Sequence, residues 1–296
     1  MVINVVLITY NHSQYVEEAF LSIINQKMPN GWDMEIIVAD DASPDNTLNI
    51  LKDLASKATV PVKFLPEQPN LGHPKNYQRA FNACEGEYIA ILEGDDYWIS
   101  DYHLYNHIEF LNHHKECVLS MNRPILYNME NKSMDLGHYD TVEPYFYLTG
   151  RDLALKNRLG NLSSCILRNE AVKKLSQKIF CYDMDDWLLG LSIAQYGIIC
   201  KHKQPTSVWR IHSNGQWSGL SVEEKGKRML RQIKDYDECL NGIYHQEFET
   251  NRLSVIKQFL PFKNTLAKRI KLWIPPLFVT IGKQLTPKAI RKYIKM

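Results

Sequence analysis

Three acidic side chains lie within four positions of the chain, Glu93, Asp95 and Asp96, directly after the apolar segment 88–92. This segment has the length and composition of a buried strand. In open α/β folds the carboxyl ends of the strands form the edge that binds ligands. Carboxylate oxygens at that edge suit a hard divalent cation shared with phosphate groups. The same residues also fit an ordinary polar turn. Taken alone, they favour neither a cation site nor a simple turn.

Two further acidic clusters occupy comparable positions. Asp40 and Asp41 come directly after a second apolar segment, residues 35–39, so we expect them at the same edge of the sheet. Asp185 and Asp186 begin a segment of apolar residues at helical spacing. Acids in the first turn of a helix are favoured by the helix dipole, whereas a positioned carboxylate can also take a proton from a hydroxyl group.

Strands and helices alternate in the first hundred residues. Apolar, β-branched segments predict strands, and apolar residues at helical spacing between them predict helices. The predicted strands are 2–9, 35–39, 60–65 and 87–92, and the predicted helices are 16–24, 48–55 and 75–83. Pro61 favours an edge position for the third strand. This alternation predicts an α/β fold with a Rossmann-like, largely parallel sheet flanked by helices.

Composition and short motifs exclude several classes of protein. Neither G-x-G-x-x-G nor G-x-x-x-x-G-K-[ST] follows a predicted strand, so phosphate charge would have to be met by metal and basic side chains. The six cysteines are scattered without C-x-x-C spacing, which indicates a reducing compartment rather than zinc or disulfides. The N-terminal segment lacks the features of a signal peptide, and we expect no transmembrane helix.

Four short motifs follow one another in the first hundred residues: Thr9-Tyr10-Asn11, the segment Asp40-Asp41-Ala42-Ser43-x-Asp45-Asn46-Thr47, Asn70-x-Gly72, and Glu93-Gly94-Asp95-Asp96-Tyr97-Trp98. Together they resemble the family 2 glycosyltransferases of the GT-A fold. The resemblance covers residues 1–218. It implies an enzyme that transfers a sugar from a nucleotide diphosphate donor with inversion at the anomeric carbon.

The resemblance also implies roles for residues at the donor side. The implied contacts to the donor nucleotide are made by Thr9, Tyr10, Asn11, Asp40, Asp41, Lys75, Glu93 and Asp95. Within this set, Thr9 and Tyr10 would line the base pocket and Asp41 would hydrogen-bond the base. The implied metal is Mn²⁺ or Mg²⁺. Asp96 would be its main ligand, with Asp95 nearer the ribose and His212 as the candidate third ligand.

On the acceptor side the resemblance implies that Asp186 is the general base, with Asp185 as its nearest rival. An acceptor hydroxyl is a poor nucleophile, so a carboxylate that accepts its proton is required. Three further residues are candidates for acceptor, phosphate or lid contacts: Trp187, Arg210 and Trp217.

The predicted organisation is a catalytic domain, 1–218, followed by a helical extension, 219–296. The first has a nucleotide-sugar-binding half, 1–98, and an acceptor-binding half, 99–218. A helix is expected over 101–114, with Leu104, Ile108 and Leu111 facing inward. His103 and His107, four positions apart on it, have a spacing that could hold zinc, but a plain helix surface is the favoured interpretation because no third ligand is apparent.

The charge is strongly asymmetric along the chain. Residues 250–296 contain eleven Lys or Arg and no acid, whereas residues 1–249 have a net charge of −9. Within the tail, Phe262, Leu266, Ile270 and Ile274 recur every four residues between basic positions. Such a basic amphipathic segment is typical of a helix at an anionic membrane surface. A helix docked on the body and a subunit contact are the alternatives, and nucleic acid is disfavoured for lack of a motif.

The sequence therefore predicts a metal-dependent inverting glycosyltransferase with an NDP-sugar donor, of which a UDP-sugar is the first candidate. The predicted acceptor is a glycan or lipid-linked glycan in surface polysaccharide synthesis. We expect it in the cytoplasm, at the inner face of the cell membrane, and a second copy of the chain is a further candidate partner. The alternatives are a nucleotidyltransferase and a non-catalytic nucleotide-binding scaffold with the same fold.

Overall fold

The computed structural model describes residues 1–259, apart from 214, 216 and 218. The predicted amphipathic tail, residues 262–296, lies outside the described residues. Within the part that is described, no helix combines the length and the apolar character needed to cross a lipid bilayer.

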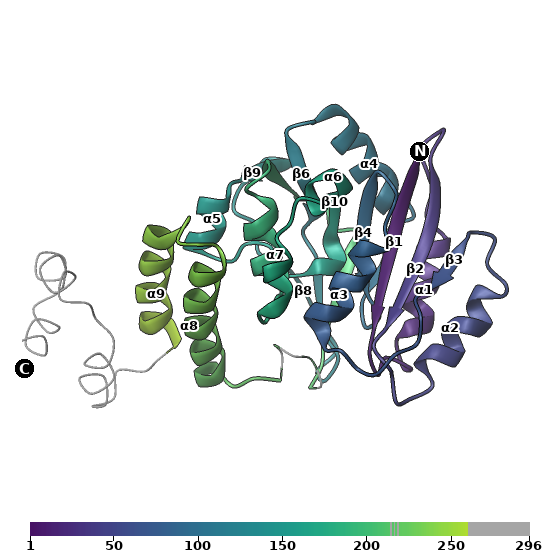
Figure 1. Ribbon diagram of the computed structural model, residues 1–296, viewed down its shortest axis with the longest axis horizontal. Coiled ribbons are helices and arrows are strands. Elements are labelled where there is room, and N and C mark those ends of the chain that lie inside the picture. Colours follow the sequence, from purple (N-terminus) through teal and green to yellow (C-terminus); the bar gives the residue numbers. More distant parts are fainter. Residues whose placement is uncertain (214, 216, 218, 260–296) are drawn as a thin grey trace, which may run out of the picture.

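An eight-stranded mixed sheet forms the centre of the molecule (Figure 1), in the order β3-β2-β1-β4-β10-β6-β11-β9. The strands are β1 (Val2–Thr9), β2 (Asp33–Asp40), β3 (Val62–Phe64), β4 (Tyr88–Glu93), β6 (Cys117–Asn122), β9 (Tyr145–Leu148), β10 (Cys165–Arg168) and β11 (Ile198–His202). The first four are mutually parallel, whereas β10 is antiparallel to both of its neighbours. The predicted largely parallel α/β fold is confirmed, and β3 lies at the sheet edge as its proline indicated.

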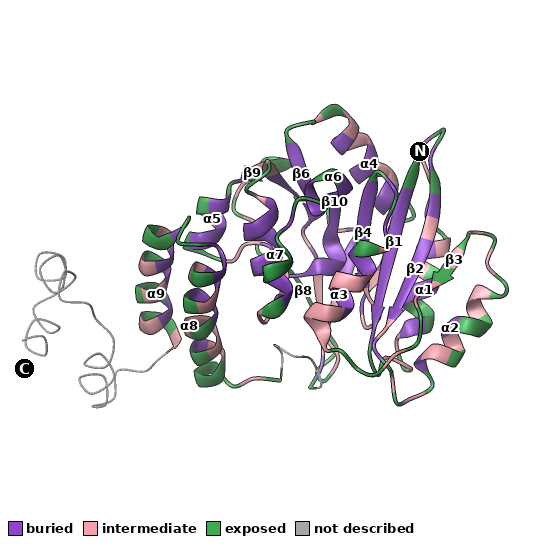
Figure 2. Ribbon diagram, in the orientation of Figure 1, coloured by how far each residue is buried: buried purple, intermediate pink, exposed green. Residues whose placement is uncertain are grey.

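Helices cover both faces of this sheet, and two buried apolar clusters fill the space beneath them (Figure 2). One cluster contains residues of α1 (Val16–Ile24), α2 (Thr47–Ala55) and α4 (His103–His113). The other contains residues of α3 (His73–Asn82), α5 (Gly150–Leu155), α6 (Asn169–Val172), α7 (Asp186–Ile193), α8 (Val222–Cys239) and α9 (His245–Phe259). Alternate strand residues enter opposite clusters, as the two-residue period of a strand requires.

A smaller sheet has four strands in the order β5-β12-β7-β8. Its strands are β5 (Tyr97–Trp98), β7 (Ile125–Asn128), β8 (Ser133–Leu136) and β12 (Ser207–Ile211). Pairing of β12 with β5 places Ser207 opposite Trp98 and Val208 opposite Tyr97. This sheet therefore brings a segment far along the chain beside the acidic turn that follows β4.

The C-terminal helices α8 and α9 lie side by side (Figure 1) and pack on the same core as α7. Buried residues of both helices, Tyr236 and Phe248 among them, contact Trp187 through their rings. The core is thus continuous across residue 218. The division into domains at that position stays a prediction.

Helix α3 begins at His73, two residues earlier than predicted. Gly72 has a φ of +81°, in the left-handed region that glycine adopts without strain. Pro74 occupies the first turn, where its missing N–H costs no helical hydrogen bond. The earlier start matters because it places His73 inside the helix.

His103 and His107 do not lie on a plain helix surface, and that interpretation was wrong. Both are buried, at 0% and 3% exposure. Nδ1 of His103 lies 2.8 Å from the Thr206 hydroxyl, and Nδ1 of His107 lies 2.7 Å from the Ser120 hydroxyl. Ser120 in turn lies 2.8 Å from Nε2 of His202. Among the described residues no group of three His, Cys, Asp or Glu side chains is arranged to hold a metal ion, so the zinc alternative gains no support.

These buried histidines make stability depend on pH. Burial lowers the pKa of His103 to about 3 and that of His202 to about 4, and it holds the pKa of His107 well below its usual value. In the unfolded chain these rings titrate near pH ~6.5, so the unfolded state binds more protons below that pH. Stability from the neutral rings is therefore present above pH ~6.5 and is lost as the pH falls towards 4.

We expect the free energy of unfolding in urea to decline between pH 7 and pH 5, and His202→Gln to make that decline shallower. His113→Gln, on the exposed part of α4, is the matched control and should leave the pH dependence of wild type unchanged. A decline as steep in His202→Gln as in wild type would contradict the role of this ring.

Candidate functional site

The carboxyl ends of β1, β2 and β4 meet at one edge of the sheet. Thr9 pairs with Asp40 in the β1–β2 register, and Ile8 pairs with Glu93 in the β1–β4 register. The Thr9 hydroxyl donates to Oδ1 of Asp40 at 2.8 Å. Because parallel strands end at the same edge, these residues of three separate motifs become neighbours.

Loop hydrogen bonds hold the segment 10–13 against the segment 43–47. The backbone N–H of Asn11, whose φ is +60°, donates to Ser43 Oγ at 2.9 Å. The N–H of Ser13 donates to Asp45 Oδ2 at 2.9 Å. Although burial opposes it, hydrogen bonds from Thr47 and Ser13 lower the pKa of Asp45 to about 2. Asp45 is therefore a charged anchor for the loop that carries Tyr10.

Asp41 holds a second loop. Its two carboxylate oxygens accept the N–H groups of Leu71 and Gly72 at 2.8 and 2.9 Å, and Asn70 donates to its carbonyl oxygen at 2.9 Å. Asp41 is buried. The carboxylate predicted to bind a nucleobase thus also shapes the Asn70-x-Gly72 motif and the start of α3.

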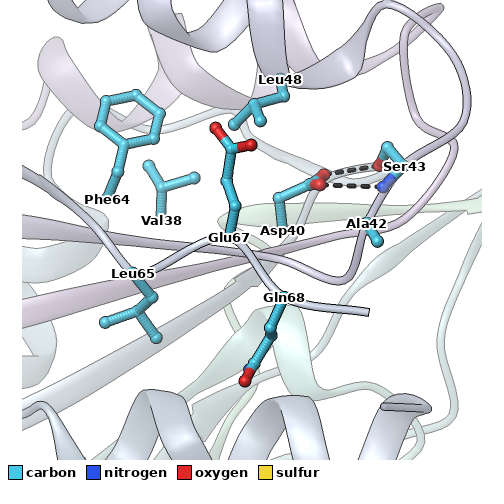
Figure 3. A pocket seen from close by; sticks show the side chains of 9 residues that line it. All are labelled: Val38, Asp40, Ala42, Ser43, Leu48, Phe64, Leu65, Glu67 and Gln68. Atoms are coloured by element: carbon cyan, nitrogen blue, oxygen red, sulfur yellow. Dashed lines mark hydrogen bonds between the residues drawn. The ribbon is translucent and has the colours of Figure 1, made fainter. Parts of the chain in front are cut away.

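A pocket of about 240 Å³ opens beside Asp40, between β2, β3 and α2 (Figure 3). Its lining residues are Val38, Asp40, Ala42, Ser43, Leu48, Phe64, Leu65, Glu67 and Gln68. Figure 3 shows Asp40 turned towards Ser43, which donates to it from both its N–H and its hydroxyl. The pocket combines an apolar wall with carboxylate and amide groups, as sites for flat polar ligands do.

Asp96 lies inside the protein, with 1% of the residue exposed. One oxygen accepts from Asn161 Nδ2 at 2.8 Å and from the Ser163 hydroxyl at 2.6 Å. The other accepts the backbone N–H of Arg210 at 2.9 Å. Burial and the charges of Asp95 and Glu93 raise the pKa of Asp96 well above its usual value. Both oxygens already have protein donors, so the geometry suits a structural carboxyl better than the main metal ligand.

Asp95, by contrast, is partly exposed and faces two histidines. Its Oδ2 lies 3.1 Å from His212 Nε2 and 3.7 Å from His12 Nε2. Against the effect of burial, the hydrogen bond and charge of His212, together with His12, lower the pKa of Asp95. A charged carboxylate beside an imidazole is a donor set that suits Mn²⁺. The residues Asp95 and His212 therefore fit the implied metal, and Asp96 fits it less well.

His12 is a residue that the sequence reasoning missed. It directly follows the motif Thr9-Tyr10-Asn11, and no role was predicted for it. Its ring approaches Asp95 only because the ends of β1 and β4 are adjacent. The only sequence signal for a role of His12 was its position directly after the motif Thr9-Tyr10-Asn11.

Arg210 and Trp187 are both buried and make contacts inside the protein. The Arg210 guanidinium is buried, donates to the Asp95 carbonyl oxygen at 2.7 Å and to Glu18, and lies over the Tyr97 ring. Trp187 is 1% exposed and donates to the Leu153 carbonyl oxygen at 2.7 Å. Both side chains make internal contacts, and the acceptor, phosphate and lid roles expected for them stay predictions.

Lys75 and Trp217 lie at the periphery. The Lys75 ammonium donates to Gln78 on its own helix at 3.1 Å and lies 3.9 Å from Sγ of Cys181. Trp217 is partly exposed, with the Lys225 ammonium 5.6 Å from its ring centre. These contacts do not test the donor-nucleotide role expected for Lys75 or the lid role expected for Trp217, and both stay predictions.

The second acidic group lies at the start of α7, and its two aspartates have different environments. Asp185 is the N-cap, and its Oδ1 accepts from the N–H groups of Trp187 and Leu188. Helix α8 adds two donors, Gln232 Nε2 to Oδ2 at 2.7 Å and the Tyr236 hydroxyl to Oδ1 at 2.9 Å. Asp185 is thus the anchor of this turn, held by four donors.

Asp186 keeps a carboxylate oxygen without a protein hydrogen bond among the described residues. Its Oδ2 accepts from Asn157 at 3.1 Å and from the Gly160 N–H at 2.6 Å, whereas Oδ1 accepts none of the hydrogen bonds described. Burial and the neighbouring Asp185 raise the pKa of Asp186 to about 7. A carboxylate that titrates near neutral pH is suited to accept a proton from a ligand.

One side chain connects the two acidic groups. His73 lies 3.4 Å from Glu93 Oε1 through Nε2 and 3.2 Å from the Met184 carbonyl oxygen through Nδ1. The Tyr77 hydroxyl donates to the same Glu93 oxygen at 3.1 Å. Glu93, the last residue of β4, and the turn that carries Asp186 therefore border one site.

Comparison with curated proteins finds several relatives of this chain. The chain is 29% identical over 263 residues to the dTDP-rhamnosyl transferase RfbG of Shigella flexneri, covering 83% of this chain and 87% of that protein. It is 26% identical over 222 residues, or 75% of its length, to the uncharacterized protein Rv1520 of Mycobacterium tuberculosis. The chain spans 62% of the length of that relative and of two further mycobacterial proteins.

Two solved structures share the fold. Staphylococcus aureus TarS 1–349 in complex with UDP-GlcNAc has a TM-score of 0.59 and 18% identity, covering 92% of this chain and 79% of that one. The mannosyltransferase PcManGT from Pyrobaculum calidifontis, in complex with GDP-Man and Mn²⁺, has a TM-score of 0.60 and 15% identity, covering 99% and 83%. At these identities the likeness concerns the fold alone.

The model of glycosyl transferase family 2 matches residues 4–176, which is more than half of the chain and contains the motifs that follow β1, β2 and β4. Together with the fold, this match shows that the chain belongs to glycosyl transferase family 2.

Proposed function

We propose that this protein is an inverting glycosyltransferase that transfers one sugar from an NDP-sugar to a hydroxyl group of a glycan or lipid-linked glycan in surface polysaccharide synthesis. The observation that carries the proposal is the single site bordered by Glu93 at the end of β4, by Asp95 just after it, and by Asp186 at the start of α7. Three observations support an NDP-sugar donor. TarS is bound to UDP-GlcNAc, PcManGT is bound to GDP-Man, and RfbG is named as a dTDP-rhamnosyl transferase.

In the proposed reaction, the acceptor oxygen attacks the anomeric carbon as the bond from that carbon to the diphosphate oxygen breaks. The acceptor proton passes to Asp186, whose second oxygen is held by Asn157 and Gly160. A single displacement of this kind inverts the anomeric configuration. A divalent cation held by Asp95 and His212 would neutralise charge on the departing diphosphate.

The donor nucleoside is assigned to the edge formed by β1 and β2. Thr9, Tyr10 and Asp41 keep the roles expected from the family, and the pocket beside Asp40 is large enough for a nucleobase. Release of free NDP from UDP-, GDP- and dTDP-sugars in the presence of Mn²⁺ tests the proposal directly. Absence of release and of transfer with all three donor classes would contradict it.

Asp186→Asn should lower the rate of transfer by about 100-fold or more, because a positioned general base contributes on the order of 10²–10⁴-fold. Donor binding, measured by calorimetry with the matching NDP, should change little. In wild type, kcat should rise with pH through about 7, where Asp186 loses its proton. An active Asp186→Asn enzyme, or a pH profile that is flat between 6 and 8, would refute the assignment of the base.

Asp95→Asn should weaken Mn²⁺ binding by more than about 100-fold. Loss of a group that only hydrogen-bonds to a metal ligand costs about 10- to 100-fold in affinity, and loss of a ligand itself should cost more. Asp96→Asn should weaken it less, because the Asp96 oxygens face Asn161, Ser163 and the backbone of Arg210. The measurement is an electron paramagnetic resonance titration of Mn²⁺ with NDP present. A larger effect of Asp96→Asn would return the main metal role to Asp96, as the sequence analysis expected.

The basic tail is assigned to an anionic membrane surface, on the inner face of the cell membrane. Its charge and the apolar residues at every fourth position are the support for this part of the proposal. In the full chain, replacing Lys263, Lys268, Arg269 and Lys271 by Gln should reduce co-sedimentation with vesicles rich in phosphatidylglycerol. Equal sedimentation of the variant and wild type would contradict a membrane role.

A further inference from the structure

His73 occupies a constrained position at the first residue of α3. The N–H groups just before it, on Leu71 and Gly72, are held by the carboxylate of Asp41. Because Asp41 directly follows β2, the backbone of His73 is tied to the edge of the main sheet. The imidazole ring has limited freedom to move. The His73 side chain is only 24% exposed, and the centres of the His73 and Tyr77 rings are 4.7 Å apart.

Both ring nitrogens of His73 face acceptors. Nε2 faces the Glu93 carboxylate at 3.4 Å, and Nδ1 faces the Met184 carbonyl oxygen at 3.2 Å. A carbonyl oxygen and an ionised carboxylate can only accept, and each neutral tautomer of histidine offers one N–H. Only the ring protonated on both nitrogens satisfies both contacts, so the geometry selects the imidazolium form.

The charges around the ring agree with this form. Glu93 approaches from β4, and the Asp185 carboxylate lies in the turn before α7, next to Asp186. On α3 itself, the Tyr77 hydroxyl donates to Glu93. Although burial opposes it, the Glu93 contact, the Met184 carbonyl and Asp185 raise the pKa of His73 above its usual value.

We propose that His73 is a positioning residue: as an imidazolium it bridges Glu93 and the Met184 carbonyl oxygen, and so fixes the donor-side carboxylate relative to the turn that carries Asp186. This deepens the proposed function and rests on it, since Glu93 is taken to contact the donor and Asp186 to act as base. The bridge joins two motifs about ninety residues apart along the chain. Without the His73 ring, Glu93 still accepts a hydrogen bond from the Tyr77 hydroxyl, and Asp185 still accepts its own hydrogen bonds. The end of β4 and the turn before α7 are then no longer joined by a shared imidazolium.

The first test measures transfer by the full-length His73→Gln and His73→Asn variants. We expect kcat to fall by about tenfold or more while the donor KM changes by less than about threefold, because alignment of the two substrates is lost and not donor binding. The matched control is His113→Gln, an exposed histidine whose Nδ1 contacts only its own helix among the described hydrogen bonds. Values of kcat within about threefold of wild type in both His73 variants would overturn the proposal.

A double-mutant cycle separates bridging from general loss of structure. In a Glu93→Gln background, His73→Gln should cost much less than it does in wild type, since one end of the bridge is already weakened. Additive losses in kcat would overturn a shared role of the two residues.

The second test needs no substrate and therefore separates this inference from the proposed function. In ¹⁵N-histidine NMR spectra of wild type at pH 7.5, the ring of His73 should have both nitrogens protonated, and Glu93→Gln should shift it towards a neutral tautomer. A neutral ring in wild type would overturn the bridge even if the enzyme transfers sugar. A protonated ring in a protein that releases no NDP from any donor would support the bridge and contradict the proposed function instead.

Discussion

The buried carboxyl group of Asp96 links three parts of the chain that are distant in sequence. It accepts hydrogen bonds from Asn161 and Ser163, which both lie just before β10, and from the backbone of Arg210 in β12. A buried carboxyl group without partners would be strongly unfavourable, so this position requires all three donors. Their convergence holds the turn after β4 against the smaller sheet. The placement of Asp95 and of His212 follows from it, because both lie within two residues of these contacts.

Neighbouring acids divide their roles according to the donors that surround them. Asp96 and Asp185 are enclosed by protein hydrogen-bond donors and hold the structure, whereas the adjacent Asp95 and Asp186 retain access to a ligand. The pKa values move in opposite directions within the first pair, downward for Asp95 and upward for Asp96. In each pair one carboxyl group holds the surrounding backbone, and the chemistry that we propose falls to its neighbour.

Histidines in this protein show how far environment determines chemistry. The buried His103 and His107 and the partly buried His202 lie near one another against β6, where burial favours the neutral rings. His73 lies between two acceptors and is favoured in its charged form. His212 is hydrogen-bonded to the Asp95 carboxylate. The residue type is the same in every case, and the difference arises from which groups the fold places around each ring.

The sequence by itself determined the fold class, the order of the N-terminal strands and helices, and the motifs that mark the family. These follow from local periodicity and from short motifs, which need no knowledge of distant contacts: β1 was predicted at its observed bounds, and β3 at the edge because of Pro61. The general position of the acids, at strand ends and at the start of α7, followed from the same reasoning. Only the tertiary structure decided which of these acids remain open. The burial of Trp187 and Arg210, the approach of His12 to Asp95 and the bridge through His73 all depend on residues far apart in the chain. A sequence pattern specifies a side chain's type and local face, but the donors and charges that set its role arrive from other elements once the chain has packed.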